Sequence, residues 1–212
     1  MYNQENLSLF PTLVSAFDLS DHSEIKKCLE IIENYETGDH GLIIGGTSSF
    51  INGDEEFLFN PELKKLRADI QNCIDLYCQD AGLEESILGT SWFNVLGKDG
   101  HVDKHRHEGS VVSGAFYPYV DEGSCPLIFE SPLRPLRMND VFENQNPYSS
   151  YFASCMPRTG LLLIFPSWLE HRTDPNPTDK RITVSFNTMR KKLIPLVAAK
   201  MHHYGHLPVD KE

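Results

Sequence analysis

The sequence has no pair of cysteines in a CxxC pattern, and its five cysteines are odd in number. These features are typical of reduced thiols, and they argue against a disulfide framework or a cysteine zinc site. The sequence also lacks an apolar run of about 18 residues, the length that spans a membrane. Its start, MYNQENLSLFPTLV, lacks the basic segment and apolar core of a signal peptide. We therefore expect a cytoplasmic protein without a membrane span.

Lysine and arginine are scarce relative to the acidic residues. There are 19 basic and 30 acidic side chains, which gives a net charge of −11. The only dense basic run, MRKKL at residues 189–193, is short. Such a chain repels nucleic acid and anionic membranes, so we expect neither as a partner. The composition leaves the substrate open, as a small molecule or a protein, and is compatible with a homodimer.

The N-terminal residues predict two helices. In the first, apolar residues recur at helical spacing; Ser20 or Asp21 can cap its start, and Gly38 can help to end it. In the second, Asn60 is the expected N-cap and Pro61 begins the first turn. Its predicted buried face consists of Leu63, Leu66, Ile70, Cys73, Ile74 and Tyr77. The glycine- and serine-rich residues 41–57, between the helices, are predicted to be a surface loop.

From residue 91 onward, the sequence consists of short runs rich in valine, isoleucine and aromatic residues, as in the strands of a sandwich or barrel. The runs are SWFNVLG, SVVSGAFYPYV, PLIFES, GLLLIFPSWL and RITVSFNTMR. Pro118 interrupts the second run and has no N–H to donate, so that strand should end, bulge or lie at an edge there. We predict one α+β, mainly β domain, with a supporting part over 1–90, a β core over 91–190 and a tail over 191–212.

One long segment inside the predicted core, residues 131–159, has no clear period. A segment of this kind in a compact domain is usually functional, often as a lid or a substrate loop. Its arginines and aromatic residues are suited to an acidic or aromatic group of a substrate, although solvation at the surface explains them equally well. These residues are Arg134, Arg137, Tyr148, Tyr151 and Phe152.

The stretch HVDKHRHEGS, residues 101–110, has His101, Asp103, His105 and His107 at alternate positions. On a β-strand these four side chains share one face, a geometry that can hold a cation. Two imidazoles at two-residue spacing can converge on one ion. Asp103 lies on the same predicted face and is an alternative ligand.

Two further residues extend this candidate metal site. His171 follows the apolar run LLLIFPSWLE, and Arg181 opens the last predicted strand ten residues later. Two ligands on one strand, a third from a distant strand and a nearby arginine form the layout of a non-haem Fe(II) site with open coordination positions. The planar fork of the arginine suits a carboxylate of a bidentate co-substrate.

The span from Ser91 to Arg190 resembles the 2-oxoglutarate- and Fe(II)-dependent oxygenases of bacteria and their phages, distant relatives of the prolyl-hydroxylase-like enzymes. The resemblance rests on three blocks in order: H-x-H…SG…Y, FPSWLEH…P and R-I-x-x-S-F-N. It implies a double-stranded β-helix, or jelly-roll, behind two N-terminal supporting helices. It also implies Fe(II) as the metal, with 2-oxoglutarate and O₂ as co-substrates, in an enzyme that oxidises, typically by hydroxylation, a substrate the sequence does not name.

The resemblance also implies roles for individual residues. The implied metal ligands are His105, His107 and His171. Arg181 is the implied partner of the C5 carboxylate of 2-oxoglutarate, and Thr183 stands where the superfamily's Arg-x-Ser motif has its serine. Asn94 and Tyr117 are further candidates for the co-substrate pocket.

The sequence departs from the superfamily at residue 107, where most members have an aspartate or glutamate. A site with three histidines has no ligand carboxylate, so its iron complex carries one more unit of positive charge. Asp103 and Glu108 are the alternatives, but Glu108 lies on the other face of a continuous strand. We favour His107. We interpret His22, His40 and His101 as partly exposed polar residues.

Two other readings remain open at this point. A cupin-like dioxygenase also uses a three-histidine iron site, but without 2-oxoglutarate. A non-catalytic jelly-roll that binds a metal or a small ligand would need no turnover. The tail has His202 and His206 four residues apart, and we interpret it as a solvated C-terminus.

Overall fold

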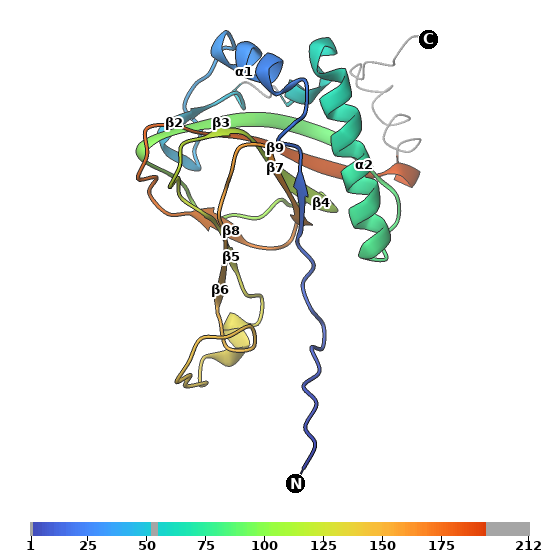
Figure 1. Ribbon diagram of the computed structural model, residues 1–212, viewed down its shortest axis with the longest axis vertical. Helices are drawn as coiled ribbons and strands as arrows, with labels where there is room; N and C mark the ends of the chain where they lie inside the picture. The colour runs from blue at the N-terminus through green and yellow to red at the C-terminus, as the bar shows by residue number, and fades with distance from the viewer. Residues whose placement is uncertain (1, 52–54, 194–212) are drawn as a thin grey trace.

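The computed structural model describes residues 2–51 and 55–193, which fold into two facing antiparallel sheets (Figure 1). In spatial order, the larger sheet consists of β1 (Ser15–Asp18), β7 (Leu161–Pro166), β4 (Val112–Val120), β9 (Arg181–Arg190), β3 (Ser86–Val102) and β2 (Ile43–Ser48). The smaller sheet consists of β6 (Phe152–Cys155), β5 (Leu127–Glu130) and β8 (His171–Thr173). The predicted jelly-roll is therefore confirmed.

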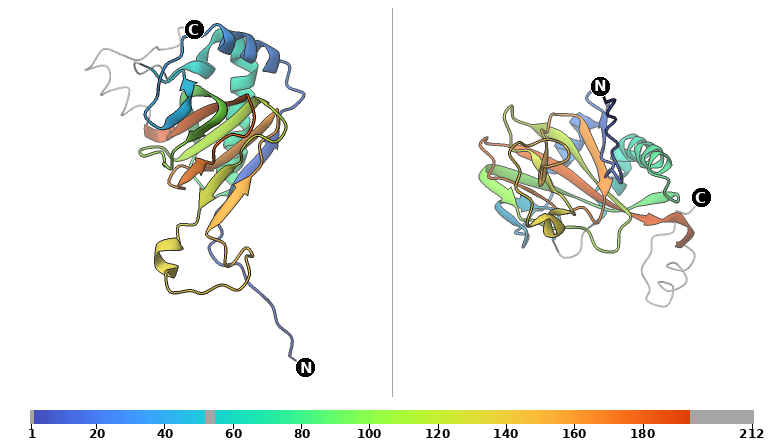
Figure 2. Two further views of the ribbon diagram at one scale, coloured as in Figure 1. Left: turned by 90° about the vertical axis from the view of Figure 1, so that its left-hand side faces the viewer. Right: turned by 90° about the horizontal axis from the view of Figure 1, so that it is seen from below.

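Two helices, α1 (Ile25–Glu33) and α2 (Lys64–Asp80), cover the outer face of the larger sheet (Figures 1 and 2). All six residues of the face predicted for the second helix are buried. Each buried aliphatic or aromatic side chain contributes about 1.5–3 kcal/mol, so this contact is a major source of stability. Short 3₁₀ helices lie at Phe57–Phe59 (η1), Pro61–Leu63 (η2), Arg134–Arg137 (η3) and Lys191–Leu193 (η4). None of the described helices is long and apolar enough to cross a membrane.

Strand β9 separates two hydrophobic cores. Its residues Ile182, Val184 and Phe186 pack in the core beneath the helices. The residues between them point the other way, toward the smaller sheet, because side chains alternate along a strand. On that inner side, Tyr117, Phe129 and their neighbours form a second core between the two sheets. The inner face of the larger sheet is therefore the place where polar side chains of β9 can meet a ligand.

The first helix begins later and ends earlier than the sequence predicts. Neither Ser20 nor Asp21 caps it, and its N-cap residue Glu24 makes no side-chain cap. The Glu24 carboxylate instead accepts a hydrogen bond of 2.7 Å from the backbone N–H of Leu66. This bond joins the start of α1 to the first turn of α2. Asn60 does cap as predicted, but it caps η2, where its side chain accepts from the N–H of Glu62.

The loop predicted over residues 41–57 is wrong in part, because β2 lies within it. The glycines of this segment argued against a strand, because glycine is unfavourable in the interior of a strand. Gly45 has a φ of +66°, and the pairing with β3 shifts register between Ile44 and Gly46. A Cβ at Gly45 would lie 3.1 Å from the Cα of Gly100, so the close approach of two backbones requires glycine here. The glycines therefore form a bulge in β2 rather than a surface loop.

Strand β4 behaves as Pro118 predicts. Its pairing with β9 shifts register between Phe116 and Tyr119, and its pairing with β7 ends at Phe116. The missing N–H of the proline is thereby accommodated in a bulge.

Residues 131–151 leave the body of the molecule and project beside the extended N-terminal residues 2–13 (Figures 1 and 2). Ser8 and Tyr148 lie within hydrogen-bond distance, 3.4 Å, across this projection. Strand β6, which the sequence did not predict, returns the chain to the smaller sheet. The predicted tail from residue 194 onward, with His202 and His206, lies outside the described residues.

Gly114 provides a test of how tightly the larger sheet packs. A Cβ at this position would lie 2.1 Å from the Cζ atom of Phe186, on the neighbouring strand β9. We expect Gly114→Ala to lower the free energy of unfolding by about 1–3 kcal/mol, because the ring must move within a filled core. Urea unfolding of this variant and of Gly41→Ala, where a Cβ meets nothing within 4 Å, checks the expectation. Equal midpoints for the two variants would contradict it.

Candidate functional site

A cavity of about 300 Å³ opens between the two sheets. Strands β3, β4, β8 and β9 line it, together with the segment that follows β3. All seven residues that the sequence and the resemblance select for the site line this one cavity: Asn94, His105, His107, Tyr117, His171, Arg181 and Thr183. The fold therefore brings together residues that are spread over much of the sequence.

Three imidazoles form a cluster in this cavity. His105 and His107 follow the end of β3, and His171 begins β8. One nitrogen from each ring lies within 4.8 Å of the others, and His107 Nε2 is 3.3 Å from His171 Nε2. Two nitrogens bound to one ion at about 2.1 Å lie about 3.0–3.4 Å apart, depending on the coordination angle. The spacing of the two rings therefore fits two ligands of one metal ion.

Backbone carbonyls orient two of the three rings. Nδ1 of His105 donates to the carbonyl of Asp103, and Nδ1 of His171 donates to the carbonyl of Leu169, each at 2.8 Å. A carbonyl can only accept, so these contacts place the ring proton on Nδ1 and leave the lone pair on Nε2. Hydrogen bonds of this kind are the usual support of histidine metal ligands.

Burial keeps the cluster neutral. Desolvation, with a contribution from His105, lowers the pKa of His171 to about 3 and that of His107 to about 4. Desolvation also lowers the pKa of His105. Three neutral imidazoles with free lone pairs are the form that binds a transition metal, and imidazole suits iron, zinc, copper and nickel. The donor set therefore fits a metal ion of this group.

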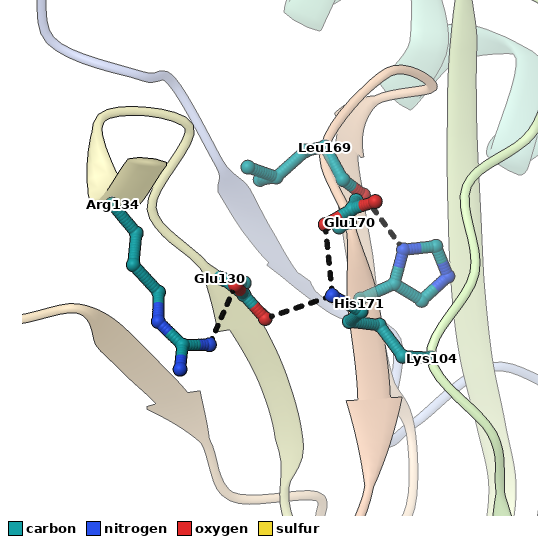
Figure 3. A network of polar contacts seen from close by, with 6 residues as sticks. All are labelled: Lys104, Glu130, Arg134, Leu169, Glu170 and His171. Atoms are coloured by element: carbon teal, nitrogen blue, oxygen red, sulfur yellow. Dashed lines mark hydrogen bonds and ion pairs between the residues drawn. The ribbon is translucent and has the colours of Figure 1, made fainter. Parts of the chain in front are cut away.

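An ion-pair network lies beside His171 (Figure 3). Lys104 Nζ lies 3.3 Å from a carboxylate oxygen of Glu170 and 3.4 Å from one of Glu130. Arg134, at the start of η3, contacts the other oxygen of Glu130 at 2.7 Å. Lys104 and Glu170 immediately precede His105 and His171. The network therefore holds the two ligand segments against β5 and links them to the base of the projection.

Arg181 lies at the inner end of the cavity and is only 2% exposed. Its guanidinium donates to the carbonyl of Cys125 at 3.2 Å, to Thr183 Oγ1 at 2.8 Å and to the hydroxyl of Tyr117 at 3.3 Å. All three acceptors are neutral, and no carboxylate of the described chain forms an ion pair with it. Burial raises the pKa of Tyr117, so its hydroxyl stays protonated. Both hydroxyls accept from Arg181 and keep their own hydrogens to donate, which makes this end of the cavity a site for an anion.

The common face predicted for His101, Asp103, His105 and His107 is wrong in part, because β3 ends at Val102 and only His105 and His107 converge. The carboxylate of Asp103 lies 3.6 Å from His101 Nε2 and outside the imidazole cluster. Glu108 lines the cavity, but it pairs with Arg106 at 3.0 Å. Among the alternatives considered, only His107 joins the other two histidines.

Sequence reasoning missed several residues of the cavity wall. His40, Phe50 and Glu55 line it, although His40 was interpreted as an isolated polar residue. They flank β2, the strand that the sequence did not predict, so no signal pointed to them. Ser185 and Asn187 also line it, and the period of two along β9 from Arg181 is the signal that could have found them.

The expectation of a substrate loop over residues 131–159 is not supported by the cavity. None of these described residues lines it, and Arg134 and Arg172 instead lie over the ring of Phe152 at 5.0 and 5.8 Å.

All seven candidate site residues lie in a part of the chain that is similar to a known family. Residues 90–187 match the model of a family described as "Putative 2OG-Fe(II) oxygenase". No curated protein matches the chain.

Solved structures share the fold at low sequence identity. A prolyl-4-hydroxylase from Pseudomonas putida is 14% identical, with a TM-score of 0.56, over 85% of this chain and 94% of that one. HygX from Streptomyces hygroscopicus, solved with nickel, 2-oxoglutarate and hygromycin B, is 14% identical, with a TM-score of 0.56, over 85% and 84% of the two chains.

A third structure is the non-haem, α-ketoglutarate-dependent epimerase SnoN from nogalamycin biosynthesis. It is 13% identical, with a TM-score of 0.61, over 84% of this chain and 76% of that one. The matched residues 90–187 contain the imidazole cluster and Arg181, so this part of the chain is similar to the 2OG-Fe(II) oxygenase family.

Proposed function

We propose that this protein is a 2-oxoglutarate-dependent oxygenase that binds Fe(II) through Nε2 of His105, His107 and His171. The observation that carries the proposal is the convergence of three neutral imidazoles in a cavity that also contains an unpaired buried arginine. Bound iron and 2-oxoglutarate supply the oxidation, in which the co-substrate is decarboxylated to succinate as O₂ oxidises a C–H bond of the substrate. The chain itself orients the ligands and excludes water.

We further propose that Arg181, Thr183 and Tyr117 bind the distal carboxylate of 2-oxoglutarate. An arginine can donate two parallel hydrogen bonds to a carboxylate, and the two hydroxyls each keep one hydrogen to donate. Asn94 lies beside this group, because it pairs with Thr183 across β3 and β9. We assign Asn94 to the wall of the co-substrate pocket.

We also propose a cytoplasmic location. All five cysteines are free, although an oxidising compartment favours disulfides. Burial raises the pKa of Cys28 to about 12, so this thiol remains protonated and behaves as a small apolar side chain.

The metal assignment predicts different effects for two histidines. His171→Ala removes one of three ligands, and we expect it to weaken Fe(II) affinity by more than about 100-fold, since even the loss of a supporting contact costs about 10- to 100-fold. His101→Ala should bind iron like the wild type, because His101 lies outside the cluster. Anaerobic titration with Fe(II), followed by metal analysis, checks both. Equal iron content in the two variants would refute the assignment.

Asp103 has a test of its own. Its contact with His105 is made by the backbone carbonyl, so Asp103→Asn should retain that hydrogen bond and bind Fe(II) with unchanged stoichiometry. The same titration measures this. If Asp103→Asn loses the metal, the aspartate is a ligand and the three-histidine assignment is wrong.

Arg181→Lys tests the co-substrate site. Lysine keeps the charge but lacks the planar fork, so we expect weaker binding of 2-oxoglutarate by about 1.5–3 kcal/mol, or roughly 10- to 150-fold. Fe(II) affinity without the co-substrate should barely change. The charge-transfer absorption that forms when 2-oxoglutarate is added to the anaerobic Fe(II) protein measures the binding.

The alternatives differ in the outcome of that titration. If Arg181→Ala binds 2-oxoglutarate like the wild type, the anion site serves another group and our co-substrate assignment fails. O₂ consumption without succinate would then favour a cupin-like dioxygenase. Metal binding without any turnover would favour a non-catalytic jelly-roll.

A further inference from the structure

The charged residues of the cavity wall, histidines apart, are few, and most of them are paired. They are Glu55, Arg106, Glu108, Arg172 and Arg181. Arg106 pairs with Glu108, and Arg172 pairs with Asp174. Within the described ranges, this leaves two charges of the wall without an ion-pair partner, the cation of Arg181 and the carboxylate of Glu55.

These two charges lie at different ends of the cavity. Arg181 is opposite Leu96 across β3 and β9. Glu55 lies beside Ser91 of β3, whose N–H donates to the Glu55 carbonyl at 2.7 Å. Leu96 is five steps along β3 from Ser91, so the backbones of Glu55 and Arg181 are about 16 Å apart along the sheet. A co-substrate bound at Arg181 therefore leaves Glu55 for another molecule.

A row of aromatic rings in the cavity wall leads to the imidazole cluster. Successive ring centroids are 5.3 Å apart for His40 and Phe50, 5.6 Å for Phe50 and Trp92, and 5.8 Å for Trp92 and His107. All four rings line the cavity, and Trp92 is only partly buried. The faces of aromatic rings carry negative potential and attract cations as well as apolar groups.

We propose that this end of the cavity binds a cationic group of the substrate, an ammonium or a guanidinium, between the carboxylate of Glu55 and the rings of Phe50 and Trp92. The inference rests on the proposed function, because it assigns a substrate class to the same site. An anionic group at this end of the cavity would face the carboxylate of Glu55 and be repelled by it. A cation held here extends its carbon chain along Trp92 toward His107, so the bond to be oxidised lies near the metal.

The test compares a cation with a neutral molecule of nearly the same shape. The two probes are Nα-acetyl-arginine amide and Nα-acetyl-citrulline amide, added anaerobically to protein loaded with Fe(II) and 2-oxoglutarate. A second pair, Nα-acetyl-lysine amide and Nα-acetyl-norleucine amide, separates an ammonium from a guanidinium. Trp92 reports binding by fluorescence, because the chain has two tryptophans and Trp168→Phe removes the other.

We expect at least one cationic probe to bind about tenfold more tightly than its neutral partner. Glu55→Gln should remove this preference, whereas Glu143→Gln, which deletes one exposed carboxylate away from the cavity, should keep it. Equal binding of both members of both pairs would overturn the proposal, as would a preference that survives in Glu55→Gln.

Failure of the proposed function looks different from failure of this inference. Loading with Fe(II) and 2-oxoglutarate is measured before any probe is added, by metal content and the charge-transfer absorption. Glu55→Gln should load like the wild type, because Glu55 contacts neither the imidazole cluster nor Arg181. A protein that loads normally but does not prefer a cation refutes the substrate class alone. A protein that does not load refutes the proposed function.

Discussion

The candidate site depends on a short antiparallel contact between two segments that are far apart in the sequence. His105 and His171 exchange both of their backbone hydrogen bonds, at 3.0 and 2.9 Å, and the N–H of His107 donates to the carbonyl of Ser167. The two paired residues therefore lie directly opposite each other, with ring centroids 4.4 Å apart. Since this strip of backbone sets the positions of all three imidazoles, the spacing of the cluster is a property of the main chain, and the side chains need only the correct rotamers.

The same cavity contains a buried cation, Arg181, which forms no ion pair within the described chain. The guanidinium of Arg181 is enclosed by neutral acceptors, and the imidazole of His171 is 5% exposed and neutral. Burying a charge costs free energy unless an opposite charge compensates for it. Because Arg181 and His171 are already oriented before binding, less free energy is lost in ordering them when a ligand binds.

The sequence predicted the parts of the molecule in which local pattern and tertiary packing agree. The buried face of α2 follows from its helical period, and the bulge at Pro118 follows from the missing N–H. Strand β2 could not be predicted, because Gly45 and Gly46 serve a close contact with β3 that only the folded sheet contains. The histidine cluster was found through its spacing and the family resemblance. Glu55 and Phe50 were not found, because the strand that positions them was itself missed.

One face of strand β9 packs in the core beneath the helices, and the other face lines the cavity. Because its side chains alternate, a single inserted or deleted residue within it would bring Ile182 and Val184 into the cavity and turn Arg181 and Thr183 toward the helices. Stability and co-substrate binding would then fail together. We therefore expect insertions to be tolerated in the projection at residues 131–151, whereas β9 should tolerate substitutions on either face but no change of length.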